Sequence, residues 1–317
     1  YVSIRHGGFS ISGVSGDEIN GLTMGAVGRG TTIEFIEVFA NFDDGYEWFG
    51  GTVNTKYLVA AFCGDDGFDY DQGFRGKGQF WFSINAEDEA GRGGEHDGGD
   101  TDETGTPFST PEIWNATYIG SGADLAPPPG GDGNNHAIIF RDNAGGMYAN
   151  SIFTDFTGDA FSVEDLASGE DSRSRLENGD LQLRDNLLWD FGAGTTLEEI
   201  VPDDFVRSSP NFSGNEIADP LLGGIGRTGD RQLDPRPSAS GPAGSASNLP
   251  PNDGFFTQAN YKGAFAPTGP IWTEDWTALD QDLITNIQET RDQGSQVPRE
   301  FILTQNYPNP FNPGTSI

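Results

Sequence analysis

Residues 43–49 read DDGYEWF and residues 65–71 read DDGFDYD, and this repeated block decides the fold. The second block begins 22 residues after the first. A run rich in branched and aromatic residues precedes each block: residues 32–42 read TIEFIEVFANF and residues 55–63 read TKYLVAAFC. Such runs predict β-strands, and the Gly-containing acidic blocks predict tight turns between them.

Similar runs stand on both sides of the two copies. Residues 1–5 and 20–24 precede them, and residues 79–84, QFWFSI, follow. A period of roughly 20 to 25 residues with several short strands per period is typical of a stacked solenoid, in which each unit buries its apolar face against the next. Helical patterning is weak, so a leucine-rich-repeat horseshoe fits poorly. We therefore predict an all-β chain that folds as a right-handed parallel β-helix.

Three regions follow from the pattern along the chain. We expect β-helix coils over residues 1–194, with an inserted Gly/Asp-rich loop at 86–111 that has no apolar period. Residues 195–296 predict an irregular and capping segment that packs on the solenoid: residues 202–254 are expected to lie along it, and the aromatic-rich residues 253–279 are expected to cap its open end. Its expected helices are a single turn at 196–200 and a longer one at about 278–290. Residues 297–317 predict a linker and the start of another domain, so we expect a longer precursor.

The charge of the chain excludes several partners. It holds 49 acidic and 17 basic residues, a net charge of -32, and only three of the basic residues are lysines. Nucleic-acid binding and docking on an anionic membrane both need a basic face. No apolar stretch reaches the roughly 18 residues of a membrane span. Screening in molar salt would relieve the self-repulsion, so the composition favours a halophilic protein over an ordinary acidic secreted one.

The acidic blocks supply the candidate metal ligands. Equivalent residues of neighbouring coils stack about 4.8 Å apart, and stacked carboxylates repel one another unless a cation or hydrogen bonds compensate. Ca²⁺ accepts six to eight oxygen ligands in irregular geometry. The alternative is that these side chains cap turn backbone N–H groups. The candidate ligands are Asp43, Asp44, Asp65, Asp66, Asp69 and Asp71.

The sequence holds no familiar catalytic motif. Cys63 is the only cysteine and sits in a strand-like run, which predicts a core residue. The three histidines lack zinc-site spacing. A lyase could still use Arg75 or Lys77 as base, and a hydrolase could use a carboxylate pair from the Asp65–Asp69 block. Acid-rich chains produce such pairs by chance, so we predict no catalytic residues.

The tail carries a more specific signal. Residues 305–313 read QNYPNPFNP, followed by Thr315 and Ile317. This string resembles the opening of the C-terminal sorting domain of bacterial type IX secretion substrates, which implies export to the cell surface. Residues 43–53 and 261–276 resemble bacterial surface proteins with a pectate-lyase-like β-helix. This resemblance implies a fold and a location but no reaction.

These observations predict an extracellular, cell-surface structural protein: a surface-layer, adhesive or filament-forming subunit. We expect it to associate with itself or with other surface proteins or glycans, and to bind no nucleic acid and insert into no membrane. Two alternatives stay open. One is a polysaccharide lyase or glycoside hydrolase of β-helix fold, and the other is a carbohydrate-binding surface module with exposed aromatic residues.

Overall fold

The computed structural model describes residues 1–285 except 9–18, 89, 100–102, 128–135 and 283. The predicted sorting-domain opening at 297–317 and most of the predicted helix at 278–290 therefore lie outside the described residues. One compact unit spans Tyr1–Asn286. No described helix is long and apolar enough to cross a membrane.

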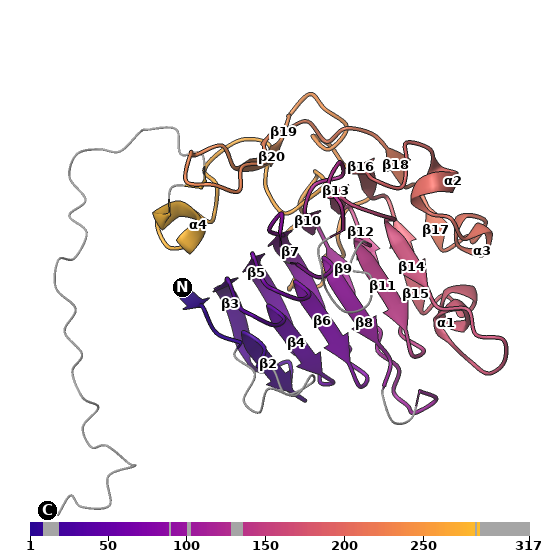
Figure 1. The fold of residues 1–317 in the computed structure, drawn as a ribbon. Helices are drawn as coiled ribbons and strands as arrows, with labels where there is room; N and C mark the ends of the chain where they lie inside the picture. Colours follow the sequence, from indigo (N-terminus) through magenta and orange to yellow (C-terminus); the bar gives the residue numbers. More distant parts are fainter. Residues whose placement is uncertain (9–18, 89, 100–102, 128–135, 283, 286–317) are drawn as a thin grey trace, which may run out of the picture. The chain divides into compact units, whose positions relative to one another are not determined.

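Two parallel sheets run through the molecule (Figure 1). The main sheet has twelve strands, and each coil contributes one long strand or two short ones. Its long strands are β3 (Thr32–Phe39), β5 (Asn54–Ala61) and β7 (Lys77–Ile84), with β1 (Val2–Arg5) at the edge. Its split strands are β9 (Glu112–Trp114) with β10 (Thr117–Ile119), β12 (Gly146–Ala149) with β13 (Ile152–Phe156), β15 (Leu181–Arg184) with β16 (Leu187–Phe191), and β17 (Phe212–Ser213) with β18 (Glu216–Ile217).

The second sheet has one short strand per coil. These strands are β2 (Leu22–Gly25), β4 (Tyr46–Phe49), β6 (Phe68–Asp71), β8 (Gly94–Asp97), β11 (Ile138–Arg141) and β14 (Phe161–Val163). Neighbouring strands of both sheets pair in parallel, each with the strand one coil away. The predicted parallel β-helix architecture is therefore confirmed, whereas its right-handed winding stays a prediction.

A column of left-handed backbone positions bends each coil of the main sheet. The strand registers place Phe35, Tyr57 and Phe80 above one another, and all three have φ between 55° and 58°. Such backbone is rare for bulky residues. Stacking offsets this cost, because the ring centroids of Phe35 and Tyr57 lie 4.4 Å apart and those of Tyr57 and Phe80 lie 5.0 Å apart. The column continues through Asn115, Asn150 and Asp185.

Successive side chains along each strand of the main sheet point to opposite faces, so they form two apolar layers, one on each side of the sheet. Side chains that point inward form the core of the solenoid, where Trp48 stacks on Trp81 with centroids 4.9 Å apart. Side chains that point outward from the main sheet, among them Val59, Phe82 and Ile84, form a second cluster with the C-terminal segment, residues 218–285.

The C-terminal segment therefore packs on the flank of the solenoid. The predicted cap over the open end stays a prediction. The segment passes back and forth over the coils, since Thr257 lies at Gln79 and Gly263 lies again at Asn150, and it reaches β3 at Ala278 (orange to yellow in Figure 1). Asn248 accepts a hydrogen bond from Asn150, Thr257 contacts Gln79, and Trp276 lies against Tyr1 near the N-terminus. It has an antiparallel pair, β19 (Leu222–Gly224) and β20 (Asp234–Pro237), and the short helix α4 (Ala278–Gln281).

Three further differences from the sequence prediction concern the coils. The segment 86–111 is not a mere loop, because β8 lies inside it and pairs with β6 and β11. The coils also continue past residue 194 through β17 and β18. Helix α1 (Ser172–Asn178), with a capping box at Asp171, was not predicted. The predicted turn at 196–200 is confirmed as α2 (Leu197–Ile200), and α3 (Asp204–Arg207) follows it.

A buried carboxylate fastens the C-terminal segment to the solenoid. Glu37 of β3 is fully buried and accepts hydrogen bonds from the backbone N–H groups of Ala278, at 2.7 and 2.9 Å, and of Leu279, at 3.3 Å. The Ser3 hydroxyl also donates to it. Burial raises the pKa of Glu37, while these donors act to lower it.

We expect Glu37→Ala to destabilise the protein by about 1–3 kcal/mol, because it leaves buried N–H groups without an acceptor. Glu37→Gln, which keeps one acceptor oxygen, should cost less. Urea unfolding measures the loss, and limited proteolysis should show earlier cleavage in the C-terminal segment. Glu34→Ala, at an exposed position of the same strand, is the control and should change stability by no more than about 0.5 kcal/mol. Equal losses in the Glu37 and Glu34 variants would refute the fastening role.

Candidate functional site

The outward side of the second sheet forms an acidic face. In β4, β6 and β8 the side chains of Tyr46, Trp48, Phe68, Tyr70 and His96 point into the core, so the alternate residues point outward. The registers place Glu47, Asp69 and Glu95 in one column. A second column runs alongside, with Asp71 and Asp97 in adjacent coils and then Arg141. The acidic face therefore stacks carboxylates of three successive coils.

Two groups of carboxylates converge where the acidic face meets the preceding turns. Asp43, Asp44 and Asp65 each offer an oxygen within 4.8 Å of the others, and so do Asp44, Glu47 and Asp69. We call the second group the cation cluster. Its residues are held by neighbouring coils: the N–H of Asp66 donates to Asp44 Oδ1 at 3.0 Å, and Asn20 donates to Glu47.

The carboxylates of the cation cluster repel one another when they are ionised and no counter-charge is bound. Burial, reinforced by neighbouring carboxylates, raises the pKa of Asp44 and that of Asp69 well above the ordinary range. Asp69 is 8% exposed, and its Oδ1 is buried with no hydrogen-bond partner. A buried carboxylate oxygen in this state costs free energy that a hard cation would recover. The donor set, carboxylate oxygens only, fits Ca²⁺.

The adjoining part of the acidic face is neutralised by arginines. Arg92, 2% exposed, pairs with Asp66 at 3.4 Å and with Glu95. Arg141 lies 3.1 Å from Glu95 and donates from Nε to Asp97 at 2.8 Å. Burial and the neighbouring Asp66 raise the pKa of Glu95 to about 8, against the lowering effect of the two guanidinium groups. In this part of the acidic face, the carboxylates are neutralised by Arg92 and Arg141.

The six predicted ligands divide between these two arrangements. Asp43, Asp44, Asp65 and Asp69 belong to the convergent groups. Asp66 is instead paired with Arg92, and Asp71 accepts the N–H of Gln72, as the turn-capping alternative predicts. Sequence reasoning missed Glu47. The repeat itself could have shown it, because Glu47 and Asp69 hold the same place in DDGYEWF and DDGFDYD.

The other candidate groups are not members of the cation cluster. Cys63 is buried, which raises the pKa of its thiol to about 12. His96 is enclosed in the core with Tyr148 Oη at 2.8 Å from its Nε2, and burial lowers its pKa to about 3. Lys77 pairs with Asp253, and Arg75 donates to the carbonyl of Gly73. Neither of these contacts involves a residue of the acidic face.

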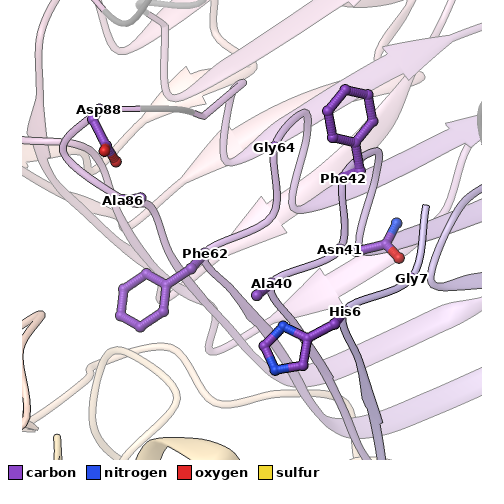
Figure 2. Close-up of a pocket in the computed structure, with 9 residues that line it drawn as sticks. All are labelled: His6, Gly7, Ala40, Asn41, Phe42, Phe62, Gly64, Ala86 and Asp88. Carbon is purple, nitrogen blue, oxygen red and sulfur yellow. The ribbon is translucent and has the colours of Figure 1, made fainter. Parts of the chain in front are cut away.

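A separate open pocket of about 360 Å³ lies at the corner that follows β3 and β5. Figure 2 shows His6 and Asp88 on different sides of it, with the ring of Phe62 between them. An imidazole and a carboxylate held apart form no acid–base pair. The acidic face therefore remains the better candidate site.

The raised pKa of Asp69 predicts a specific pH dependence. A carboxyl group whose pKa is higher in the folded than in the unfolded chain stabilises the fold at low pH, and this stabilisation is lost as pH rises through the folded pKa. Without divalent cations, the Tm should therefore fall as pH rises above about 4, and it should fall less in Asp69→Asn. Asp124→Asn, at an exposed position, is the control for lost net charge. Parallel Tm curves for the wild type and Asp69→Asn would contradict the assignment.

Comparison with known proteins gives one match. The family model described as pectate-lyase-like beta helix domain matches residues 1–216, a span that ends within the last coil strand, β18. No curated protein and no solved structure matches the chain. The match covers more than half of the 317 residues and the whole run of coils. The chain therefore belongs to the pectate-lyase-like β-helix domain family.

Proposed function

We propose that the chain is a calcium-stabilised, right-handed β-helix domain of an exported surface protein, and that its role is structural. The observation that carries the proposal is the cation cluster: Asp44, Glu47 and Asp69 converge on the acidic face, and the buried Oδ1 of Asp69 has no partner. Ca²⁺ would join neighbouring coils through these oxygens and remove their repulsion.

Burial favours a structural ion over a catalytic one. Within the cation cluster, Asp44 and Asp69 are each at most 9% exposed, so a polymeric substrate could reach few of their oxygens. A catalytic metal needs an open coordination position that faces the substrate. An ion enclosed among these side chains would instead hold the coil corners together.

Sequence features support the surface location and the partners. The QNYPNPFNP string supports export, and the net charge of -32 supports a salty medium and argues against nucleic acid. A stacked β-helix presents strand edges at its ends, which suits association with further copies or with other surface proteins or glycans. Surface-layer, adhesive or filament-forming subunits all fit this description.

Calcium should raise the Tm of the wild type. At 10 mM Ca²⁺, a site with a dissociation constant of about 0.1–1 mM, as in extracellular modules, adds about 1–3 kcal/mol. Mg²⁺ should add less, since it demands octahedral geometry and retains water. Asp69→Asn and Glu47→Gln should abolish the calcium effect, and Asp124→Asn should keep it. The proposal fails if NaCl of equal ionic strength raises the Tm as much as CaCl₂.

A polysaccharide lyase or hydrolase is the second candidate, and Glu95 favours it. Its pKa is raised to about 8, and its neighbour in the column is Asp69. A carboxyl group that keeps its proton near neutral pH beside other carboxylates has the character of a general acid. The two guanidinium groups on Glu95 oppose this, because they stabilise its ionised form.

A glycan assay separates the two candidates. The structural role predicts no release of unsaturated or reducing ends from acidic or neutral polysaccharides, with or without Ca²⁺. The enzymatic role predicts release that Glu95→Gln lowers by about 10²-fold or more and Asp124→Asn leaves unchanged. Release with this dependence would replace the structural role with the enzymatic one.

Carbohydrate binding through stacked aromatic residues, the remaining alternative, receives less support. An aromatic strip does exist on the flank, but its ring faces are occupied: Phe35 stacks on Tyr57, and Trp272 stacks on Phe265 with centroids 5.1 Å apart. A sugar ring that binds by stacking needs a free aromatic face. Phe35 and Tyr57 contact Trp276 and Trp272 of the C-terminal segment instead.

A further inference from the structure

We propose a neutral-saccharide binding site in a polar pocket on the outer side of the main sheet, away from the acidic face. The pocket has a volume of about 430 Å³, which suits a small ligand. Strands β9, β12 and β15 supply its floor, where Glu112, Met147 and Gln182 stand in one column of the strand register. Because three adjacent strands hold the floor, its side chains have fixed spacing.

Arg184 supplies the main hydrogen-bond donor of the pocket. Its Nη2 contacts only the thioether sulfur of Met147, at 2.8 Å, and sulfur is a weak acceptor. Its Nε is buried without a hydrogen-bond partner. Among the described residues, no carboxylate lies within ion-pair distance of Arg184, whereas Arg92, Arg141 and Arg175 each pair with two acids. In so acidic a chain, an unpaired guanidinium in a pocket is unusual.

Packing holds Arg184 and its neighbours in place. The guanidinium lies 6.0 Å from the ring centroid of Trp114, within cation–π range. Trp114 is 4% exposed, is covered by Phe256 of the C-terminal segment and donates to Glu112 at 3.0 Å. The amide nitrogen of Gln182 donates to the carbonyl of Gly179 at 2.8 Å. The site is therefore organised before any ligand binds.

The mixture of groups indicates the ligand class. Arg184 donates hydrogen bonds, while the carboxylates of Glu112 and Asp180, which also line the pocket, accept them. Sugar hydroxyls do both, so a neutral saccharide can satisfy every group. A sugar acid would meet two carboxylates and one guanidinium on a protein of net charge -32. A neutral saccharide therefore fits better than a uronate.

Isothermal titration with neutral hexasaccharides, cellohexaose and mannohexaose, and with hexagalacturonate tests the proposal at fixed salt. We expect a neutral hexasaccharide to bind the wild type and hexagalacturonate to bind at least about tenfold more weakly. Arg184→Ala should weaken neutral binding about tenfold or more, the effect of losing a charge-assisted hydrogen bond. Arg184→Lys, which keeps the charge but loses the fork of donors, should weaken it less. Arg75→Ala, an exposed arginine elsewhere, should bind as the wild type does.

A second pocket variant and a titration in EGTA complete the test. Gln182→Ala checks the pocket without disturbing Trp114, and it should also weaken binding. EGTA should not change the affinity, because the pocket contains no residue of the cation cluster, so this proposal and the calcium proposal can fail separately. Absence of binding by both neutral probes, unchanged binding in Arg184→Ala, loss of binding in EGTA or a preference for hexagalacturonate would each overturn it.

Discussion

The parallel stacking of coils, about 4.8 Å apart, is the constraint on which the rest of the structure depends. It turns a sequence repeat into a row of contacts: residues 22 or 23 positions apart become direct neighbours, as Tyr46 and Phe68 or Leu58 and Trp81 do. A repeated aromatic residue becomes a stack that stabilises the core. A repeated acid becomes a column of like charges that needs compensation. The same geometry therefore creates both the core and the candidate site.

The repulsion between stacked carboxylates is handled differently in two parts of the acidic face. Around Glu95 and Asp97 the chain supplies Arg92 and Arg141, so the carboxylates are paired within the protein. Around Asp44 and Asp69 the described contacts are turn and side-chain hydrogen bonds, and the Oδ1 of Asp69 has none. A buried ion pair costs desolvation free energy, but its two charges neutralise each other. A group of convergent carboxylates keeps a net negative charge, which favours the binding of a cation. This contrast within one sheet is the reason why we propose calcium for one part of the acidic face and not for the other.

The C-terminal segment covers the apolar flank of the solenoid. Outward residues of β5 and β7 are as apolar as the core, so an uncovered flank would be a large exposed patch. The segment covers this flank and is fastened to it by Glu37, which accepts hydrogen bonds from Ala278 and Leu279. It also supplies Phe256, which packs on Trp114 and supports the polar pocket around Arg184. Covering the flank and shaping a pocket are thus two results of one docking event.

The sequence by itself determined the repeat, the strand-rich coils, the parallel β-helix and four of the acids that converge, because period and alternation are local properties of a chain. It misassigned the region around β8, where Gly, Glu and His replace the apolar pattern and only pairing with β6 and β11 makes a strand. Only the tertiary structure decided that the C-terminal segment lies on the flank, that Arg92 and Arg141 neutralise part of the acidic face, and that no carboxylate of the described residues comes within ion-pair distance of Arg184. These outcomes depend on contacts between residues up to about 240 positions apart, such as Glu37 with Ala278, and no periodicity records such contacts.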